Sequence, residues 1–313
     1  MEQQLEEMQR LPDGQKSDVD ELQEFYDNAK KRISATVLAS GTNRIEKQAP
    51  TGRRIYIARH AERIDFAFGD WIPYSFDETG NYIRKDLNMP KTLPKRSSSL
   101  WKSDTPLTVL GRYHARLTGE AMKEAGVQID LVYSSPSFRC IQTAASILEG
   151  LGLQESHSIR VEPGLFEWTQ WYQSGLPKWL THRELVAAGY NVATDYEPFS
   201  TVEYLNQRMQ ETIPDYFQRN TELMKELIKT TYGNILVVGH AATLNTCTRH
   251  FVGTEMLPIV KFYQLLHKIP YCSMAVLESK NYGGRGDGWK LVEPPCYPLT
   301  NTKTERYDWK VLL

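Results

Sequence analysis

The sequence lacks the long apolar run that a membrane-spanning helix requires. Such a helix needs about 20 consecutive apolar residues, and no stretch of the 313-residue chain approaches that length. The first residues, MEQQLEEMQR, are polar and acidic, whereas a signal peptide begins with basic residues followed by an apolar segment. A formal net charge of -1 provides no global basic field for nucleic acid or an anionic membrane surface. We therefore expect a cytoplasmic protein that binds neither membranes nor nucleic acid.

Cysteine is scarce, and its spacing matches no metal or redox motif. The four cysteines are far apart and form no CxxC pair, which argues against a zinc site and against a thiol redox motif. No metal-ligand cluster is present in the motifs described below. The sequence predicts reduced thiols in the core, no bound metal and no cofactor. The cysteines are Cys140, Cys247, Cys272 and Cys296.

The first 50 residues differ in composition from the rest of the chain. In residues 1–50, Gln, Glu, Lys and Asn predominate and apolar residues are sparse. The interval 18–38 can form one amphipathic helix, and the GTNRIEKQAPTG that begins at residue 41 is typical of a linker. We interpret this segment as a polar extension to a domain that spans residues 51–313. A partly disordered tail is an equally compatible interpretation.

A long irregular stretch interrupts the domain early. Residues 64–106 are rich in aromatic residues, Pro, Asn and Ser and show no sustained helix or strand period. A connection this long in a compact domain usually forms a wall or lid over a site, so we interpret it as an insertion. Its aromatic residues either line that site or pack the insertion against the domain, and packing is favoured for any single one. They include Phe66, Phe68, Trp71 and Tyr74.

Four short apolar runs have the pattern of buried strands, and each is followed by charged or ionisable side chains. In open α/β sheets, ligands bind just beyond the carboxyl ends of the strands. We therefore expect these side chains to share one site. The runs are 54–58, 130–135, 158–162 and 234–240, and the side chains that end or follow them are, in order, Arg59 with His60, Arg139, Glu167 with Trp168, and His240.

Apolar residues at helical spacing predict the helices that connect these strands. One helix has Thr108 as its N-cap and Gly126 as its stop, and another has Ser135 as its N-cap and Pro136 in its first turn. The apolar face of the first helix comprises Leu110, Tyr113, Leu117 and Met122. The other predicted elements are helices at 181–189, 201–230 and 243–249 and strands at 274–279 and 289–294.

The side chains at the strand ends form a set suited to phosphate chemistry. Planar guanidinium groups match phosphate oxygens, so Arg59 and Arg139 aimed at one cavity indicate a phosphate ligand. A neutral imidazole beside them can attack phosphorus and carry the phosphoryl group. Glu167, with a pKa raised by its aromatic neighbours, can protonate the leaving group and then activate water. Each residue alone is more often structural, but together they favour an enzyme.

Three motifs in these regions resemble the signature blocks of one protein family. RHAER at 59–63, SSPSFRCIQTA at 134–144 and GHAATLN at 239–245 are similar to those of the histidine phosphatase (phosphoglycerate mutase-like) superfamily. FEW at 166–168 and DLNMP at 86–90 narrow the resemblance to one branch. That branch contains the phosphatase domains of the T-cell ubiquitin ligand proteins, also called suppressors of T-cell receptor signalling, and the insect ecdysteroid-phosphate phosphatases. The resemblance covers residues 53–310.

The resemblance implies a fold, a mechanism and an assembly. The implied fold is an α/β protein, a three-layer α/β/α sandwich around a mostly parallel central sheet. The implied mechanism is metal-independent hydrolysis of a phosphate monoester through a phosphohistidine, with His60 as nucleophile and Glu167 as acid. The implied phosphate pocket comprises Arg59, Arg63, Arg139 and His240. Members of this branch act on phosphotyrosine in proteins or on steroid phosphates, and domains of this kind form homodimers.

Two alanines leave the activity and the substrate open. Ala61 and Ala241 follow the two histidines where this branch usually has glycine, and each adds a methyl group beside the phosphate. The leading hypothesis is an enzyme that hydrolyses aryl phosphates such as protein phosphotyrosine. One alternative is a steroid- or sugar-phosphate phosphatase or mutase. The other is a weakly active scaffold that binds phosphotyrosine.

Overall fold

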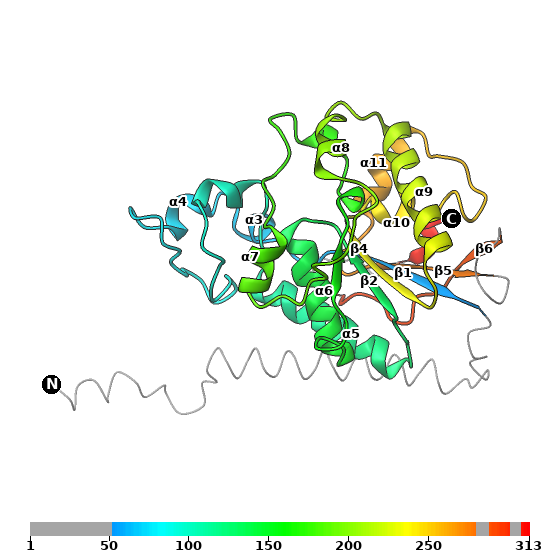
Figure 1. Ribbon diagram of the computed structural model, residues 1–313, viewed down its shortest axis with the longest axis horizontal. Helices are drawn as coiled ribbons and strands as arrows, with labels where there is room; N and C mark the ends of the chain where they lie inside the picture. Colours follow the sequence, from blue (N-terminus) through cyan, green and yellow to red (C-terminus); the bar gives the residue numbers. More distant parts are fainter. Residues whose placement is uncertain (1–51, 280–287, 301–307) are drawn as a thin grey trace. The chain divides into compact units, whose positions relative to one another are not determined.

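The described part of the chain contains a six-stranded sheet. The structure is a computed structural model that describes residues 52–279, 288–300 and 308–313, so the extension proposed at 1–50 lies outside the described residues. The strand order across the sheet is β3-β2-β4-β1-β5-β6 (Figure 1). The strands are β1 Arg54–Arg59, β2 Leu131–Ser134, β3 Ile159–Val161, β4 Ile235–Gly239, β5 Met274–Ser279 and β6 Trp289–Val292.

Four neighbouring strands of the sheet run in parallel. β4 pairs in parallel with β1 on one side and with β2 on the other, and β2 pairs in parallel with β3. β5 is antiparallel to β1, and β6 is antiparallel to β5. Every residue of β4 is buried, as expected for a strand that helices cover on both faces. The predicted mostly parallel sheet is confirmed.

Side chains of the strands alternate between two apolar cores. In β1, Tyr56 and Ala58 belong to the core that also contains residues of α5 Val109–Glu124 and α6 Phe138–Leu151. Ile55 and Ile57 belong to the core that contains residues of α9 Ile213–Thr230 and α11 Ile259–His267. Figure 1 shows α5 and α6 on the opposite side of the strands from α9. The predicted three-layer α/β/α sandwich is therefore confirmed.

Small residues determine how α5 packs against α6. A Cβ atom added at Gly119 would lie 2.1 Å from the backbone oxygen of Ile147, so the two helix backbones approach closely. Thr108 caps α5 as predicted, because its side chain accepts a hydrogen bond from the Gly111 amide. The predicted apolar face is wrong for Leu110 and Tyr113, which are exposed. The close approach favours glycine and alanine at the contact instead of large apolar side chains.

The prediction of one helix over 201–230 is also wrong. The segment forms α8 Val202–Asn206 and then α9, because Thr212 begins a new helix. The Thr212 side chain accepts from the Asp215 amide, the Asp215 side chain accepts from the Thr212 amide, and Pro214 lies in the first turn. Other described helices are α3 Ile64–Phe68, α4 Ile72–Ser75, α7 His182–Ala187, α10 Thr243–Thr246 and the 3₁₀ helices η1 Ser98–Lys102, η2 Pro163–Leu165, η3 Thr169–Trp171 and η4 Trp309–Leu312. The sequence reasoning did not predict α11, and α10 is shorter than predicted.

The interval 64–106 holds two short helices and one 3₁₀ turn joined by irregular chain. Trp71 is 2% exposed and lies 5.9 Å from Phe76 and 6.4 Å from Tyr82, measured between ring centroids. The packing interpretation therefore holds for Trp71, whereas Phe66 and Tyr74 are exposed. No helix within the described ranges has the length and apolar character needed to cross a membrane.

Candidate active site

The parallel register brings three strand ends to one edge of the sheet. Arg59, the last residue of β1, lies opposite Gly239, the last residue of β4. The His60 amide donates to the Gly239 carbonyl at 2.9 Å, and the Ser135 amide donates to the Val238 carbonyl at 2.9 Å. The residues that follow β1, β2 and β4 are thus held next to one another by backbone hydrogen bonds. This is the edge at which an α/β sheet binds its ligand.

His60 presents a free ring nitrogen in a buried site. The residue is 3% exposed, and its Nδ1 lies 2.8 Å from the Ala61 carbonyl oxygen. Because a carbonyl oxygen can only accept a hydrogen bond, Nδ1 carries the proton and Nε2 keeps its lone pair. Burial, together with the positive charges of Arg139 and Arg59, holds the pKa of His60 well below its usual value. A neutral imidazole with a free Nε2 is the form that can attack phosphorus.

His240 lies beside His60 and is fixed through both ring nitrogens. The ring centroids are 5.5 Å apart. The Arg139 Nη2 group lies 3.2 Å from His240 Nδ1, and because arginine can only donate, Nδ1 accepts. His240 Nε2 therefore carries the proton and donates to Ser135 Oγ at 2.9 Å. Burial lowers the pKa of His240 to about 3, against the opposing effect of Glu167.

Arg139 is a buried cation with unused donors. Its side chain is fully buried, and its Nη2 donates to Glu167 Oε1. Its Nε and Nη1 have no hydrogen-bond partner within the described residues. Leaving buried donors unpaired is unfavourable, so the site is suited to an anion that accepts from them. The second residue of α6 supplies this side chain, as the first-turn prediction required.

The predicted cap of α6 is wrong. Ser137, not Ser135, precedes the first helical residue, so Pro136 lies before the helix and not in its first turn. The helix start is satisfied from elsewhere, because Asp104 Oδ1 accepts from the Phe138 amide at 2.8 Å. The Ser135 hydroxyl is therefore available to bind His240.

Arg59 and Arg63 flank the two histidines. The Arg59 guanidinium lies 4.4 Å from the centre of the Tyr271 ring, Nη1 donates to the Ile269 carbonyl, and Nε has no partner within the described residues. Arg63 makes a bidentate pair with Asp65 at 2.9 and 2.6 Å. Its positive charge also contributes to the low pKa of His60. Arg63 is thus near the site, with its Nε and Nη2 directed at a neighbouring carboxylate.

Glu167 completes the cluster, but its predicted ionisation is wrong. The residue is 7% exposed, and its Oε2 lies 3.7 Å from His240 Nδ1. Burial alone would raise the pKa of Glu167, but His240 and Arg139 outweigh it and lower the pKa to about 2. The expected aromatic surround is present, since the Tyr172 hydroxyl contacts Glu167 and the Tyr172 ring lies 4.9 Å from the ring of Phe166. The positive charge of Arg139 and the neighbouring His240 have the larger effect.

Comparison with known proteins identifies the family. A sequence model of the histidine phosphatase superfamily (branch 1) matches residues 95–291. The chain belongs to this superfamily. The predicted family is thereby confirmed, although the matched residues begin after the first motif and do not include His60.

Similar proteins include members of the predicted branch. The chain is 52% identical over 263 residues to an ecdysteroid-phosphate phosphatase of Drosophila melanogaster. This alignment covers 83% of this chain and 34% of that protein. It is 42% identical over 271 residues to ubiquitin-associated and SH3 domain-containing protein B of Mus musculus. This alignment covers 84% of this chain and 42% of that protein. The chain thus spans about a third to two-fifths of the length of these curated relatives.

A solved structure has the same fold. The crystal structure of the ecdysone phosphate phosphatase of the silkworm Bombyx mori in complex with tungstate has a TM-score of 0.67 and 34% sequence identity to this chain. The superposition covers 83% of this chain and 100% of that chain. The phosphoglycerate mutase-like architecture predicted for this histidine phosphatase superfamily member is therefore confirmed.

The two alanines are accommodated without backbone strain. Cys272 is the one non-glycine residue with positive φ in the described ranges, so neither Ala61 nor Ala241 needs a conformation that only glycine adopts readily. Ala61 is fully buried, and its amide donates to Thr143 Oγ1 at 3.0 Å. In this histidine phosphatase superfamily member, neither alanine therefore imposes a strained backbone on the site.

Sequence reasoning missed the residues that contact Glu167 and His60. Tyr172 donates from its hydroxyl to Glu167 Oε1 at 2.5 Å, and Tyr271 lies 5.7 Å from the His60 ring. Arg219 donates to the carbonyls of Gly164 and Phe166 just before Glu167. No motif or period marks these positions. The nearness of Tyr172 to Glu167 in the sequence was the one available signal.

Candidate metal ligands do not gather anywhere in the described ranges. No group of three or more His, Cys, Asp or Glu side chains there is arranged to hold a metal ion. The four cysteines are free thiols.

Proposed function

We propose that this chain hydrolyses phosphate monoesters through a phosphohistidine formed on His60. The observation that carries the proposal is the free Nε2 of a neutral, buried His60 next to a buried arginine with two unpaired donor nitrogens. The first supplies a nucleophile, and the second supplies a binding site for an oxyanion. The tungstate held by the silkworm relative supports this assignment, because tungstate is a tetrahedral oxyanion like phosphate.

The reaction takes two steps. In the first, His60 Nε2 attacks phosphorus, the bond from phosphorus to the ester oxygen breaks, and Glu167 gives that oxygen a proton. In the second, water attacks the phosphoryl group, the bond between phosphorus and nitrogen breaks, and Glu167 takes the proton of the water. Arg59, Arg63 and Arg139 hold the phosphoryl oxygens and stabilise their charge during both steps, and His240, fixed by Arg139 and Ser135, completes the proposed pocket.

Substrate binding must itself change the ionisation of Glu167. In the free site the carboxylate is stabilised by Arg139 and His240. A phosphate dianion placed on Arg139 adds negative charge beside the carboxylate and competes for the same cation. Both effects raise the pKa of Glu167 and favour the protonated acid. The proton can arrive with the substrate, because phosphate monoesters retain a proton near neutral pH in part of the population.

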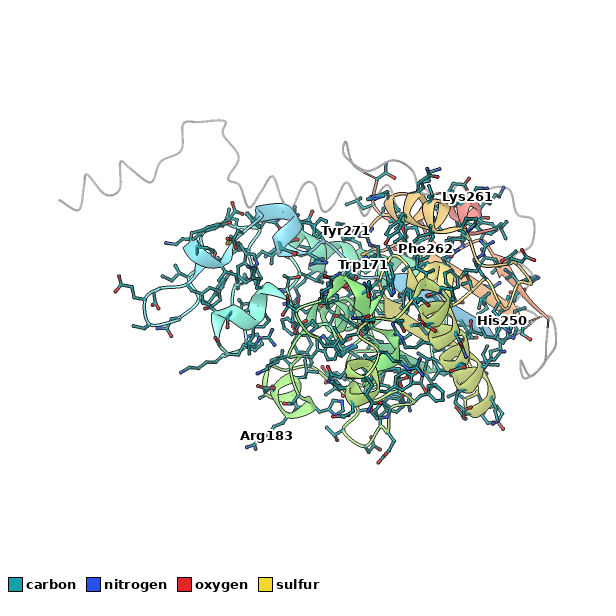
Figure 2. All side chains as sticks on the ribbon, turned by 90° about the horizontal axis from the view of Figure 1, so that it is seen from above. Trp171, Arg183, His250, Lys261, Phe262 and Tyr271 are labelled. Carbon is teal, nitrogen blue, oxygen red and sulfur yellow. The ribbon has the colours of Figure 1, made fainter. Side chains whose placement is uncertain are left out.

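Aromatic side chains near the site support an aryl phosphate as substrate. The Tyr271 ring lies beside His60 and Arg59, and Trp168, which follows the acid, contacts Trp171 at 5.8 Å and Tyr263 at 6.3 Å. Trp171 is 44% exposed, and Figure 2 labels it together with Tyr271. Such rings can stack on the phenyl group of phosphotyrosine.

A steroid phosphate is the second candidate. The relative at 52% identity is an ecdysteroid-phosphate phosphatase, and the solved structure is an ecdysone phosphate phosphatase. The same aromatic surface can contact an apolar ring system. A sugar-phosphate enzyme of the mutase type is less favoured, because a polar sugar gains little from an aromatic wall.

Steady-state hydrolysis of four compounds tests the proposal. The substrates are para-nitrophenyl phosphate, a phosphotyrosine peptide, a steroid phosphate and 3-phosphoglycerate, each with wild type, His60→Ala and the control His182→Ala in α7. We expect wild type and the control to turn over at least one substrate and His60→Ala to lose that turnover. Turnover by His60→Ala near the wild-type rate would refute the nucleophile assignment. A wild type that binds phosphotyrosine but hydrolyses nothing would favour a scaffold.

Metal independence and assembly are separate proposals. Since the proposed steps use only side chains, EDTA should leave the rate unchanged, and inhibition that added metal reverses would contradict this. The homodimer and the cytoplasmic location stay predictions. Sedimentation velocity and imaging of the tagged full-length protein test them.

A further inference from the structure

The two oxygens of Glu167 have different surroundings. Oε1 accepts hydrogen bonds from Arg139 Nη2 and from the Tyr172 hydroxyl, the latter at 2.5 Å. Oε2 lies 3.7 Å from His240 Nδ1, which is longer than a hydrogen bond, and no described residue donates to it. Both acceptor positions of Oε1 are therefore occupied, and those of Oε2 are free.

Tyr172 is held in the same short loop as Glu167. Its ring lies 4.9 Å from the ring of Phe166, the residue before Glu167. Its amide donates to the Thr169 carbonyl at 2.8 Å, which closes the short η3 turn between the acid and the tyrosine. The hydroxyl and the carboxylate thus belong to one compact loop. Ring packing and backbone hydrogen bonding keep the hydroxyl aimed at the carboxylate independently of the contact between the two groups.

We propose that Tyr172 is a positioning residue for the general acid, because its hydroxyl and Arg139 together occupy Oε1 and leave Oε2 as the oxygen that exchanges the proton. This inference rests on the proposed phosphatase function. A proton cannot settle on Oε1 without displacing one of its two donors. The acid therefore delivers its proton from one defined oxygen, on the side of the carboxylate that faces His240.

The pH dependence of Glu167 has several contributors besides Tyr172. Arg139 from α6, His240 after β4 and Arg63 after β1 all favour the carboxylate. Arg59 at the end of β1 also lies within its electrostatic reach. The thiol of Cys140 in α6 and the hydroxyl of Tyr216 in α9, both buried and un-ionised near neutral pH, also lie within electrostatic reach of Glu167. Removing the Tyr172 hydroxyl leaves all of these charges in place, so its effect can be separated from theirs.

The test compares Tyr172→Phe with a matched control. Phenylalanine keeps the ring that packs on Phe166 and removes only the donor. The control, Tyr196→Phe, removes an equivalent donor from a buried glutamate outside the site, because the Tyr196 hydroxyl donates to Glu162 Oε2 at 2.7 Å. Rates are measured against pH for an alkyl phosphate and for para-nitrophenyl phosphate, whose leaving group needs little protonation.

We expect Tyr172→Phe to slow the alkyl phosphate about tenfold and to change para-nitrophenyl phosphate less than about twofold. The KM of both should change little, since the variant keeps the aromatic ring and leaves the cations of the phosphate pocket in place. The lost donor stabilised the carboxylate, so the pKa of the acid rises in the variant. The fall in alkyl-phosphate rate at high pH should then move up by about one pH unit. The control Tyr196→Phe should reproduce the wild-type pH profile and the wild-type ratio of the rates on the two substrates.

Two results overturn the inference. Equal losses on both substrates with an unmoved pH profile would mean that Tyr172 only supports the structure. The same pH shift in Tyr196→Phe would mean that the shift is a general effect of lost stability. If the wild type hydrolyses neither substrate, the proposed function itself fails. The wild-type rates alone therefore distinguish failure of the proposed function from failure of the inference about Tyr172.

Discussion

Removing the guanidinium of Arg219 should destabilise the fold and slow catalysis together. Arg219 is 2% exposed in α9, and its Nε and Nη2 donate to Glu211 at 2.7 and 2.9 Å. Its Nη1 donates to the carbonyls of Gly164 at 2.6 Å and Phe166 at 2.9 Å. In Arg219→Met, the Glu211 carboxylate, itself 3% exposed, stays buried without its cation. The loop that carries Glu167 also loses three hydrogen bonds, because Arg219 Nη2 donates to the Glu167 carbonyl as well, at 3.4 Å.

The size of the effect follows from the burial. Breaking a buried ion pair by removing one partner costs about 3–5 kcal/mol. At about 2–4 °C per kcal/mol for a domain of this size, Tm should fall by about 10 °C. Hydrolysis of an alkyl phosphate should fall about tenfold at a temperature where both proteins are folded, because the acid is less well positioned. Urea unfolding and steady-state assays measure the two effects.

The double variant Arg219→Met with Glu211→Gln is the matched control. It removes both charges, and a buried neutral amide costs less than a buried unpaired carboxylate. We expect it to recover part of the lost stability but not the lost activity, since the loop carbonyls still lack their donor. A single variant that loses less than about 1 kcal/mol, or a double variant that is no more stable than the single, would refute the reasoning.

Three further predictions concern the acid, the helix contact and the partly exposed His114. Glu167→Gln should slow an alkyl phosphate about 10²–10⁴-fold and para-nitrophenyl phosphate far less; equal losses in steady-state assays would count against Glu167 as the acid. Gly119→Ala places a Cβ 2.1 Å from the Ile147 oxygen, so the free energy of unfolding should fall by about 3 kcal/mol. The exposed control Arg112→Ala should stay within about 0.5 kcal/mol in the same urea titration, and similar losses in both would contradict the packing argument. Burial lowers the pKa of His114 to about 4, so the unfolded chain takes up a proton first as the pH falls from about 6.5 to 4. The free energy of unfolding should therefore fall by about 2 kcal/mol as the pH decreases from about 6.5 to 4, a value reduced because His114 is partly exposed. His114→Gln should flatten this part of the curve of unfolding free energy against pH. An unchanged curve in that variant would contradict the prediction.

Local sequence patterns determined the strands and the positions where chemistry follows them. The apolar runs at 54–58 and 234–240 correspond to β1 and β4, because a strand covered on both faces must be apolar along its length. His60 and His240 follow these runs directly. Parallel pairing then brings the two strand ends to one edge of the sheet. The sequence therefore predicted where the candidate site lies and, through its motifs, predicted the family.

Some sequence patterns were compatible with two structures, and the tertiary packing or a local capping signal selected one of them. The face of α5 was misassigned because both its large apolar residues and its small residues have helical spacing. The close contact with α6 selects the small residues. The break between α8 and α9 depends on the capping box at Thr212, a local start signal that competes with a continuous helical period. In both cases the sequence contained the residues for either structure, and the pattern alone did not show which of the competing signals is stronger.

Protonation states were decided only by the tertiary structure. The aromatic neighbours of Glu167 predicted a raised pKa, but Arg139, 28 residues earlier in the sequence, and His240 reverse the direction. The tautomer of His60 depends on one carbonyl contact, and the role of Ser135 depends on the distance to His240 Nε2. These properties follow from charges and hydrogen bonds summed over side chains that are distant in sequence. Electrostatic energy depends on distance in space, which the order of residues along the chain does not specify.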